Sequence, residues 1–379
     1  MRKSPAAGDD RALMRECLDL ASRGAGFASP NPMVGALLVK DGRIIGCGWH
    51  HRSGGPHAEV ECLKACTEDP RGATMYVNLE PCTHYGKTPP CADRLIAAGL
   101  RRVVIAMNDP NRLVNGKGVR KLAEAGLEVT VGVLEREAAY LNRQFIAHIR
   151  QRRPYVHVKV AQSLDGKISG GQGKWISSLE SRKLVHRWRT THDAVLVGAG
   201  TVRKDHPLLT TRLVKGRNPH IIILDGALNL KRDELRFPRD NGRRVILCTT
   251  RRAVRRHQGS VRTLAKDGIE ILALQVRGRR IQLPELLHCL YQSGVSSILV
   301  EGGSDIFTQF AGSGLVDEWS VFIAPRLLGR GIQAFHSTLD GSANRGHGKV
   351  NTLGCYRVGK DVLLRGFKRR YDSEIIGPS

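Results

Sequence analysis

The chain has 379 residues, long enough for two domains of ordinary size. Hydrophobic residues make up 41% and charged residues 25%, a globular balance, and the net charge of +25 raises the question of a nucleic-acid or anionic partner. Because the sequence contains no apolar run of about 18 residues, we expect no transmembrane helix. The charged N-terminus is unlike a signal peptide, so we expect a cytoplasmic protein whose nine cysteines are reduced or bind metal.

The first half of the sequence predicts alternating helices and strands. An Asp41-Gly42 pair between two apolar runs is a strong hairpin signal. We predict strands at 33–40, 43–50, 74–80, 101–107 and 127–133, and helices at 9–23, from His57 onward, 91–100, 119–126 and 134–152. An opening hairpin followed by this alternation indicates an α/β/α sandwich with helices on both faces of one sheet.

Three potential metal ligands stand at the ends of these elements. His57 begins a helix, Cys82 follows a strand, and Cys91 begins the next helix, whose positive end should favour a thiolate there. One His and two Cys leave the fourth position of a tetrahedral zinc site open for water, which is the catalytic pattern. Zinc lets that water act as hydroxide near neutral pH, and Glu59 is placed to carry its proton.

This arrangement of His-x-Glu and two later cysteines is the layout of zinc deaminases that act on nucleobases. It therefore predicts hydrolytic deamination of an amino-heterocycle. We interpret the other seven cysteines as ordinary core or surface residues. Cys62 and Cys66 are the nearest rival ligand pair, because they lie one turn apart on the helix that begins at His57. We expect them to pack inward beside Leu63.

The second half again alternates and predicts a second α/β domain. Strand signals lie at 155–161, 193–198, 220–225, 243–249, 269–274, 296–302, 318–325 and 362–367, and helix signals at 178–192, 283–294 and 304–314. No Gly-x-Gly-x-x-Gly follows a strand, so a Rossmann dinucleotide site is not supported. Gly302-Gly303 opens a helix directly after Glu301 and has two interpretations: a cradle for a cofactor phosphate, or a plain strand–helix turn.

The sequence resembles the bifunctional riboflavin-biosynthesis deaminase/reductase family over nearly its whole length. Eight residues separate Cys82 from Cys91, as is typical of that family, where other deaminases usually have two. Further matching motifs are SPNPMVG (29–35), NDPNRLVNGKG (108–118), KVAQSLDGK (159–167), VGAGTVRKDHPLLTTR (197–212) and EGGSDIF (301–307). The resemblance implies a cytidine-deaminase-like α/β/α sandwich at 1–152, and a dihydrofolate-reductase-like α/β domain at 153–379 that uses NADPH.

The resemblance also implies residue roles. In the deaminase domain, the contacts to a phosphorylated pyrimidine would come from Asn31, His50, His84 and Lys87. In the reductase domain, the cofactor would lie beside Trp175, Thr201, Asp205 and Gly303, and the substrate beside Lys159, Arg189, Leu209, Arg212 and Glu301. Guanidinium groups suit a phosphate because they bind it bidentately. The expected cofactors are Zn²⁺ and NADPH, and we also expect a homo-oligomer.

Three alternatives remain open. The loop at 168–174 is shorter than is usual in the family, and Gly173 and His206 depart from its common residues, so the reductase half could be degenerate. The net charge leaves a nucleic-acid deaminase in consideration, and a zinc-stabilised module without turnover is the third. Much of the charge lies at 231–280, with 15 basic and 5 acidic residues but only one aromatic, Phe237. We interpret this stretch as a solvated basic surface, because a single-strand binder interleaves aromatic residues with its charge.

Overall fold

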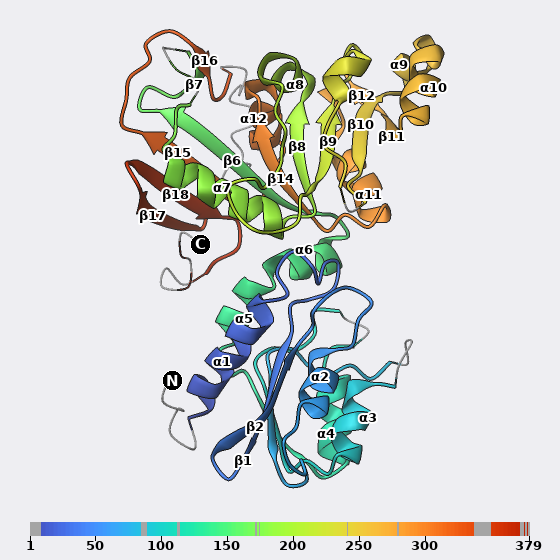
Figure 1. Cartoon of the computed structure of the whole chain (residues 1–379), viewed down its shortest axis with the longest axis vertical. Coiled ribbons are helices and arrows are strands. Elements are labelled where there is room, and N and C mark those ends of the chain that lie inside the picture. The colour runs from blue at the N-terminus through green and yellow to red at the C-terminus, as the bar shows by residue number, and fades with distance from the viewer. Residues whose placement is uncertain are drawn as a thin grey trace. The chain divides into compact units, whose positions relative to one another are not determined.

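The computed structural model describes residues 9–84, 89–111, 114–170, 173, 175–240, 242–278, 280–336, 350–371, 375 and 377. The chain divides into two compact units, Met1–Gln151 and Arg152–Ser379. Each unit is built on a sheet of its own, with helices against it (Figure 1). No helix in the described ranges is both long enough and apolar enough to cross a membrane.

The first unit contains a five-stranded sheet of order β2-β1-β3-β4-β5. Its strands are β1 (Gly35–Lys40), β2 (Arg43–Trp49), β3 (Thr74–Val77), β4 (Arg102–Ile105) and β5 (Glu128–Val131). β1 is antiparallel to both of its neighbours, and β3, β4 and β5 are parallel. The predicted hairpin is confirmed: Asp41 and Gly42 have φ values of 47° and 74°, which is why an Asp-Gly pair suits this tight turn.

Helices cover both faces of this sheet, so the predicted α/β/α sandwich is confirmed (Figure 1). On one face lie α1 (Asp10–Ser22) and α5 (Glu135–Leu141), and on the other lie α2 (Ala58–Lys64), α3 (Cys91–Ala97) and α4 (Lys117–Glu124). Asp9 caps α1, where its carboxylate accepts from the N–H groups of Arg11 and Ala12.

The prediction of one long helix over residues 134–152 is wrong. The segment forms two helices, α5 and α6 (Arg143–Gln151), which meet at Asn142. The side chain of Asn142 is fully occupied elsewhere: its Oδ1 accepts from Met33 N at 2.8 Å and its Nδ2 donates to Met33 O at 2.9 Å. These two hydrogen bonds connect Asn142 to a loop that is distant in the sequence, at the point where the helix is interrupted. The apolar periodicity of the segment does not predict this interruption.

The second unit contains a nine-stranded sheet of order β11-β10-β9-β8-β14-β6-β15-β18-β17. The strands are β6 (Tyr155–Ser163), β8 (Ala194–Gly198), β9 (His220–Leu224), β10 (Val245–Thr250), β11 (Ile269–Leu274), β14 (Ser297–Gly302), β15 (Glu318–Ala324), β17 (Thr352–Val358) and β18 (Asp361–Phe367). The last two pairings, β15–β18 and β18–β17, are antiparallel and the others are parallel. Two small ribbons complete the strands: β7 (Lys167–Ser169) with β16 (Ile332–Gln333), and β12 (Val276–Arg277) with β13 (Arg280–Ile281).

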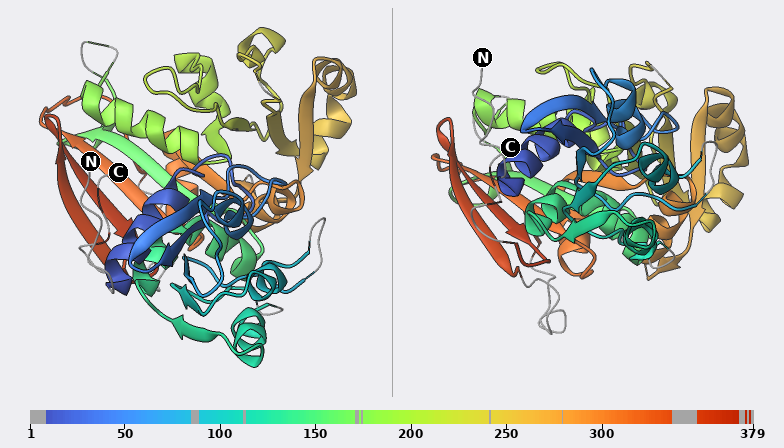
Figure 2. Two further views of the ribbon diagram at one scale, coloured as in Figure 1. Left: turned by 60° about the horizontal axis from the view of Figure 1, so that its bottom comes forward. Right: turned by 90° about the horizontal axis from the view of Figure 1, so that it is seen from below.

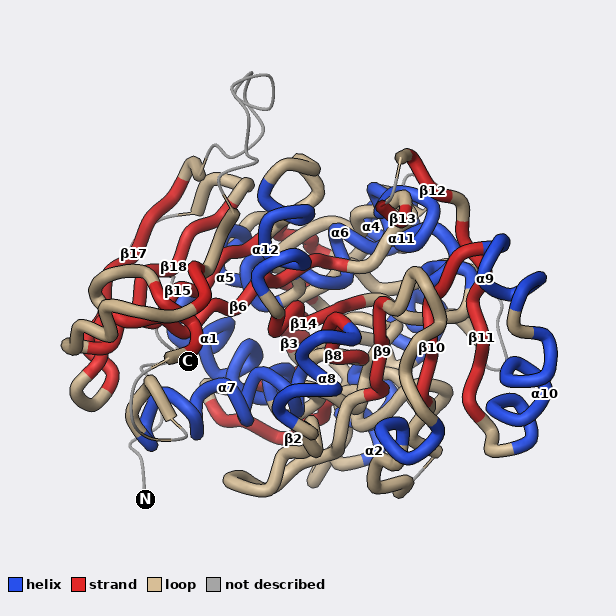
Figure 3. Tube along the Cα trace, turned by 90° about the horizontal axis from the view of Figure 1, so that it is seen from above, coloured by secondary structure: helices blue, strands red, loops and turns tan. Residues whose placement is uncertain are grey.

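Helices cover both faces of the parallel part of this sheet. α7 (Leu179–Thr191), α8 (Ala199–Asp205), α9 (Arg251–Arg256) and α10 (Gln258–Lys266) lie on one face, and α11 (Leu283–Gln292) and α12 (Ser304–Ala311) on the other. A short 3₁₀ helix, η1, spans Arg232–Leu235. Strands that are buried on both faces have continuous apolar sequences, and the buried run Ile221–Ile223 is an example. β17 and the α9–α10 pair lie at opposite ends of this unit; they are drawn in red and gold in Figure 2 and are labelled in Figure 3.

Candidate active sites

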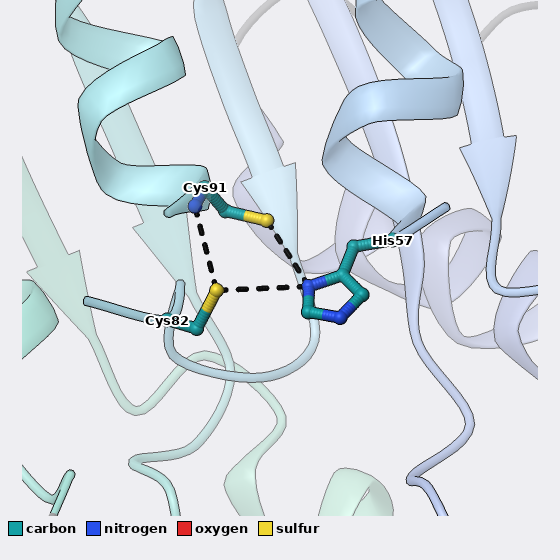
Figure 4. Close-up of side chains that lie close together, drawn as sticks. All are labelled: His57, Cys82 and Cys91. Carbon is teal, nitrogen blue, oxygen red and sulfur yellow. Dashed lines mark hydrogen bonds between the residues drawn. The ribbon is translucent and has the colours of Figure 1, made fainter. Parts of the chain in front are cut away.

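The three predicted metal ligands lie together in the first unit. His57, Cys82 and Cys91 each offer one ligand atom, and these atoms lie within 4.8 Å of one another. His57 Nδ1 is 3.2 Å from Cys91 Sγ and 3.6 Å from Cys82 Sγ (Figure 4). Within the described ranges, this is the one group of three or more His, Cys, Asp or Glu side chains with such spacing. Its imidazole and thiol donors fit Zn²⁺ and leave a fourth tetrahedral position for a water molecule.

The rival pair does not join this group. Cys62 is fully buried and packs against the β2 backbone, where a Cβ added to Gly48 would come within 2.4 Å of Cys62 N. Burial also raises the pKa of the Cys62 thiol far above its ordinary value. Cys66, just beyond α2, is only half-buried. The expectation that Cys62 packs inward is therefore confirmed.

The local electrostatics of the ligands favour a thiolate at Cys82. A hydrogen bond from the Cys91 thiol lowers the pKa of Cys82 to about 4, with further help from His57 and from the backbone N–H of Cys91. That N–H, the first of α3, lies 3.4 Å from Cys82 Sγ. The first N–H of α3 is thus directed to Cys82, and the hydrogen bond that the two thiols share raises the pKa of Cys91. The preference of the helix start for a thiolate at Cys91 stays a prediction for the metal-bound site.

Glu59 stands beside these ligands on the first turn of α2. His57 is the N-cap of that helix in an extended conformation, so the ligand and the carboxylate leave the chain two residues apart. Glu59 is 4% exposed, and burial raises its pKa. Its carboxylate also interacts with the thiol of Cys91. A buried carboxyl group with a raised pKa can both accept and return a proton near neutral pH.

Two of the predicted pyrimidine contacts are paired in the structure. His50 Nδ1 lies 2.9 Å from the carbonyl of Pro56, so it must donate there, and Nε2 then accepts from Asn31 Nδ2 at 3.2 Å. Burial lowers the pKa of His50, which keeps the ring neutral. Its ring meets that of His57 edge-on at 5.8 Å, so this pair borders the metal ligands.

The other two predicted pyrimidine contacts lie in the loop between Cys82 and Cys91. His84 is exposed and lies near Asp109, where it acts to lower the pKa of that carboxyl against burial, which raises it. Lys87 lies outside the described residues.

Three further residues shape this site and were not found from the sequence. Glu80 directly precedes the Pro81-Cys82 pair, and its carboxylate accepts from the backbone N–H groups of residues 109, 116, 118 and 119 at 2.8–3.3 Å. Asn78 and Asn142 both donate to the carbonyl of Met33, which anchors the loop that carries Asn31. The sequence does show an acidic residue at the end of a predicted strand. It does not show which backbone N–H groups Glu80 binds, because these groups lie about 30 to 40 positions away in the sequence.

In the second unit, Glu301 joins two of the predicted substrate residues. Arg189 Nε and Nη2 donate to its two oxygens at 2.6 and 2.8 Å, and Lys159 Nζ lies 3.4 Å away. Burial acts to raise the pKa of Glu301, but the charges of Arg189 and Lys159 outweigh it and lower the pKa to about 2. The remaining Arg189 nitrogen, Nη1, donates to the carbonyl of Thr210 at 2.8 Å.

These contacts separate the roles of the two predicted phosphate arginines. All three guanidinium nitrogens of Arg189 are engaged with protein groups, so this side chain is committed to orienting Glu301. Arg212 is exposed, and within the described residues its guanidinium hydrogen-bonds one group, Thr210 Oγ1, at 3.4 Å. Burial and the charges of Arg189 and Arg182 lower the pKa of Arg212. Arg212 is therefore the arginine that remains accessible to an anion.

The predicted cofactor residues are brought together only in part. A Cβ added to Gly303 would lie 3.1 Å from Thr201 Oγ1, so the start of α12 touches the first turn of α8. Two helix starts with a glycine between them fit a cofactor phosphate, because their free N–H groups can bind it. Asp205 is exposed at the last residue of α8. Trp175, 45% exposed, stacks with Arg182, whose Cζ is 4.5 Å from the ring centroid.

Comparisons with known proteins match both units. Residues 7–107 match the model of the cytidine and deoxycytidylate deaminase zinc-binding region, and residues 154–364 match that of the RibD C-terminal domain. The riboflavin biosynthesis protein RibD of Aquifex aeolicus is 42% identical over 326 residues, which is 85% of this chain and 89% of that protein. The Escherichia coli K12 RibD is 39% identical over 335 residues, covering 84% and 89%.

Solved structures agree with these matches over nearly the whole chain. Acinetobacter baumannii RibD superposes with a TM-score of 0.82 at 34% identity and covers 95% of this chain and 99% of that one. A diaminohydroxyphosphoribosylaminopyrimidine deaminase/5-amino-6-(5-phosphoribosylamino)uracil reductase from Thermotoga maritima gives 0.77 at 35% identity, with 94% and 98% covered.

The folds and the metal ligands define a zinc-dependent deaminase joined to a reductase. The chain belongs to the RibD family of riboflavin-biosynthesis proteins. The resemblance stated from the motifs is thereby confirmed, as is the cytidine-deaminase-like fold of the first unit. Zn²⁺ and NADPH are the cofactors of such an enzyme.

Proposed function

We propose that this enzyme catalyses two successive steps of riboflavin biosynthesis. The first unit deaminates 2,5-diamino-6-(5-phosphoribosylamino)pyrimidin-4(3H)-one, and the second reduces the ribosyl group of the product to a ribityl chain. The observation that carries the proposal is the presence, in one chain, of the three-ligand centre beside Glu59 and of the Lys159–Glu301–Arg189 cluster. The Thermotoga maritima relative is named for the same pair of activities.

In the deaminase site, zinc would be held by His57, Cys82 and Cys91, and when bound it lowers the pKa of a coordinated water. Glu59 takes a proton from the attacking water and returns it to the leaving amine, so that oxygen is added at C2 of the pyrimidine and ammonia departs. Because Asn31 uses its amide nitrogen on His50, its carbonyl oxygen is left to accept from an N–H of the pyrimidine. This pair orients the ring.

In the reductase site, bound NADPH would supply a hydride for C1′ of the ribosyl group, whose C1′–O4′ bond breaks as O4′ takes a proton, which leaves the open ribityl chain. Lys159 and Glu301 lie together at neighbouring strands, β6 and β14, and bind the polar groups of the sugar. Arg189 holds the Glu301 carboxylate in place, and Arg212 binds the substrate phosphate. Holding the sugar carbon against the nicotinamide is the main requirement of hydride transfer, so these residues act by positioning.

The test is to follow both activities of the full chain with purified substrates. We expect ammonia release from the diaminopyrimidinone and NADPH oxidation with its deaminated product. Ammonia release without NADPH oxidation would identify a deaminase with a degenerate reductase half, the alternative suggested by the short loop at 168–174. Deamination of a base in tRNA, in place of the small substrate, would favour the nucleic-acid deaminase and give strongly salt-dependent binding.

Removal of zinc is expected to separate the two activities. Incubation with a strong chelator should abolish ammonia release, because the three ligands alone cannot acidify a water molecule. NADPH oxidation with the deaminated substrate should continue, since His57, Cys82 and Cys91 all belong to the first unit. Metal analysis before and after chelation, with recovery of ammonia release on adding Zn²⁺, completes the measurement. Equal loss of both activities would contradict this assignment.

We also propose that the enzyme works in the cytoplasm as a homo-oligomer. None of the nine cysteines forms a disulfide, as is usual in a reducing compartment. Leu353 on β17 and Val362 on β18 are 63% and 41% exposed, and the strand register places both on the same face of the sheet edge, where exposed apolar side chains favour association. Light scattering on the purified chain measures the mass in solution.

A further inference from the structure

The loop that carries Arg212 is anchored to the rest of the second unit by side chains. It runs between α8 and β9, and four of its residues bond through their backbones. Arg243 Nη2 donates to the carbonyl of Leu209 at 2.6 Å, and Arg189 Nη1 donates to that of Thr210 at 2.8 Å. The N–H of residue 211 donates to Asn218 at 2.7 Å, and that of residue 213 to His186 at 3.2 Å. Leu209 has a φ of +52°, so the loop adopts a backbone conformation that side chains must stabilise.

His186 contacts this loop on both sides of Arg212. It is 4% exposed on α7, one turn before Arg189, so the two side chains lie on the same face of the helix. Its Nδ1 accepts from the N–H of Leu213, and its ring also hydrogen-bonds with the backbone of Thr211. Arg212 is the residue between these two contacts. Together with Asn218 and Arg189, the imidazole of His186 therefore holds the backbone on either side of Arg212.

The bond from Leu213 requires a neutral imidazole. Burial lowers the pKa of His186 to about 4, as do the charges of Arg189 and Arg212, while Glu301 and the Thr211 backbone act in the opposite direction. At neutral pH the ring is thus uncharged, and Nδ1 has a lone pair for the N–H of Leu213. His186 holds the loop without adding a positive charge that would repel Arg212.

We propose that His186 is a positioning residue of the reductase step, which places Arg212 for the phosphate of the substrate and so makes the enzyme selective for the phosphate monoester. The inference rests on the proposed reductase function. Among the described residues, the Arg212 guanidinium has the long contact to Thr210 Oγ1 as its one hydrogen bond, so its position depends on the backbone that carries it. Because Arg189 is committed to Glu301, no second arginine of the predicted pair can replace it.

The test compares two substitutions on two substrates. His186→Leu keeps a similar volume but removes the acceptor, whereas His186→Asn can place its Oδ1 near the position of Nδ1. With the phosphorylated substrate, we expect His186→Leu to raise KM about tenfold with kcat changed less than twofold, the size of one lost hydrogen bond. His186→Asn should stay within about twofold of the wild type. With the dephosphorylated substrate, neither variant should change KM.

Inorganic phosphate gives a second measurement that needs no turnover of the poorer substrate. As a competitive inhibitor of NADPH oxidation, it should bind His186→Leu about tenfold more weakly than the wild type. Equal KM values for His186→Leu and wild type, or an equal rise with both substrates, would overturn the proposal.

The controls separate this inference from the proposed function. Ammonia release should be the same in all variants, and thermal unfolding should show a folded second unit. If His186→Leu fails to fold, His186→Ala removes the same acceptor with less steric demand. Absence of NADPH oxidation in the wild type would instead refute the reductase function itself.

Discussion

Replacement of Glu59 by Gln is expected to lower ammonia release by about 10²- to 10⁴-fold, the usual contribution of a general acid–base group. The amide has nearly the shape of the carboxylate, but it cannot accept the proton of the attacking water. Because Glu59 is not one of the three ligands, the zinc content should be unchanged. Initial rates of ammonia release, together with metal analysis of the same samples, measure both quantities.

Glu61→Gln is the matched control for this experiment. Glu61 lies on the same helix, two residues on, in an exposed pair with Lys64, and its loss should leave ammonia release unchanged. NADPH oxidation with the deaminated substrate should be normal in both variants. Undiminished ammonia release from Glu59→Gln would show that another group moves the proton.

The Glu301→Gln variant is expected to lose NADPH oxidation and to destabilise the second unit. The substitution leaves Arg189 and Lys159 without their carboxylate partner, and removing one member of a buried ion pair costs about 3–5 kcal/mol. Thermal unfolding of wild type and variant measures this difference in the free energy of unfolding.

The contribution of Glu301 to the free energy of unfolding should decrease as the pH falls. The carboxyl has a folded-state pKa of about 2, below its ordinary value of 4.5, so its stabilising contribution is present at neutral pH. That contribution is lost as pH falls from the ordinary pKa toward 2. The difference in unfolding temperature between the wild type and Glu301→Gln should therefore shrink between pH 6 and pH 3.

Glu270→Gln serves as the control for a carboxylate of the same unit in an exposed pair. Glu270 bonds Arg244 at the surface, where such a pair contributes at most about 1 kcal/mol.

Ammonia release should be retained in Glu301→Gln, because the first unit has its own sheet and core. A Glu301→Gln enzyme that is as stable and as active as the wild type would contradict the role assigned to this cluster.

Much of the fold could be predicted because the signals were local. The Asp41-Gly42 turn, the apolar runs of the central strands and the amphipathic face of α1 each lie within a few residues. The elements that were missed have weak local patterns. α9 and α10 are dominated by arginine and small polar residues, with Ala253 and Leu264 as their buried positions. β17, at the edge of its sheet, alternates in burial and contains an interior glycine, Gly354.

The zinc ligands and Glu59 could be predicted because their spacing is a strong motif, and the structure brings the ligands within reach of one another. The residues that hold the sites in place could not. These residues bond backbone groups about 30 to 45 positions away, as Glu80, Asn78 and His186 do. The sequence does not show which backbone group a side chain will contact, because every residue type has nearly the same backbone. For the same reason, the sequence alone could not show that Arg189 is committed to Glu301.

The Glu80 carboxylate has a consequence for the electrostatics of the deaminase site. Four backbone N–H groups converge on it, two of them in the first turn of α4. Such a convergence is what proteins elsewhere use to capture an anion from solution. Here the anion is part of the chain itself and cannot exchange. The protein has a net charge of +25 and so attracts anions. Because the Glu80 carboxylate already accepts from the N–H groups near Cys82, free phosphate does not compete for them.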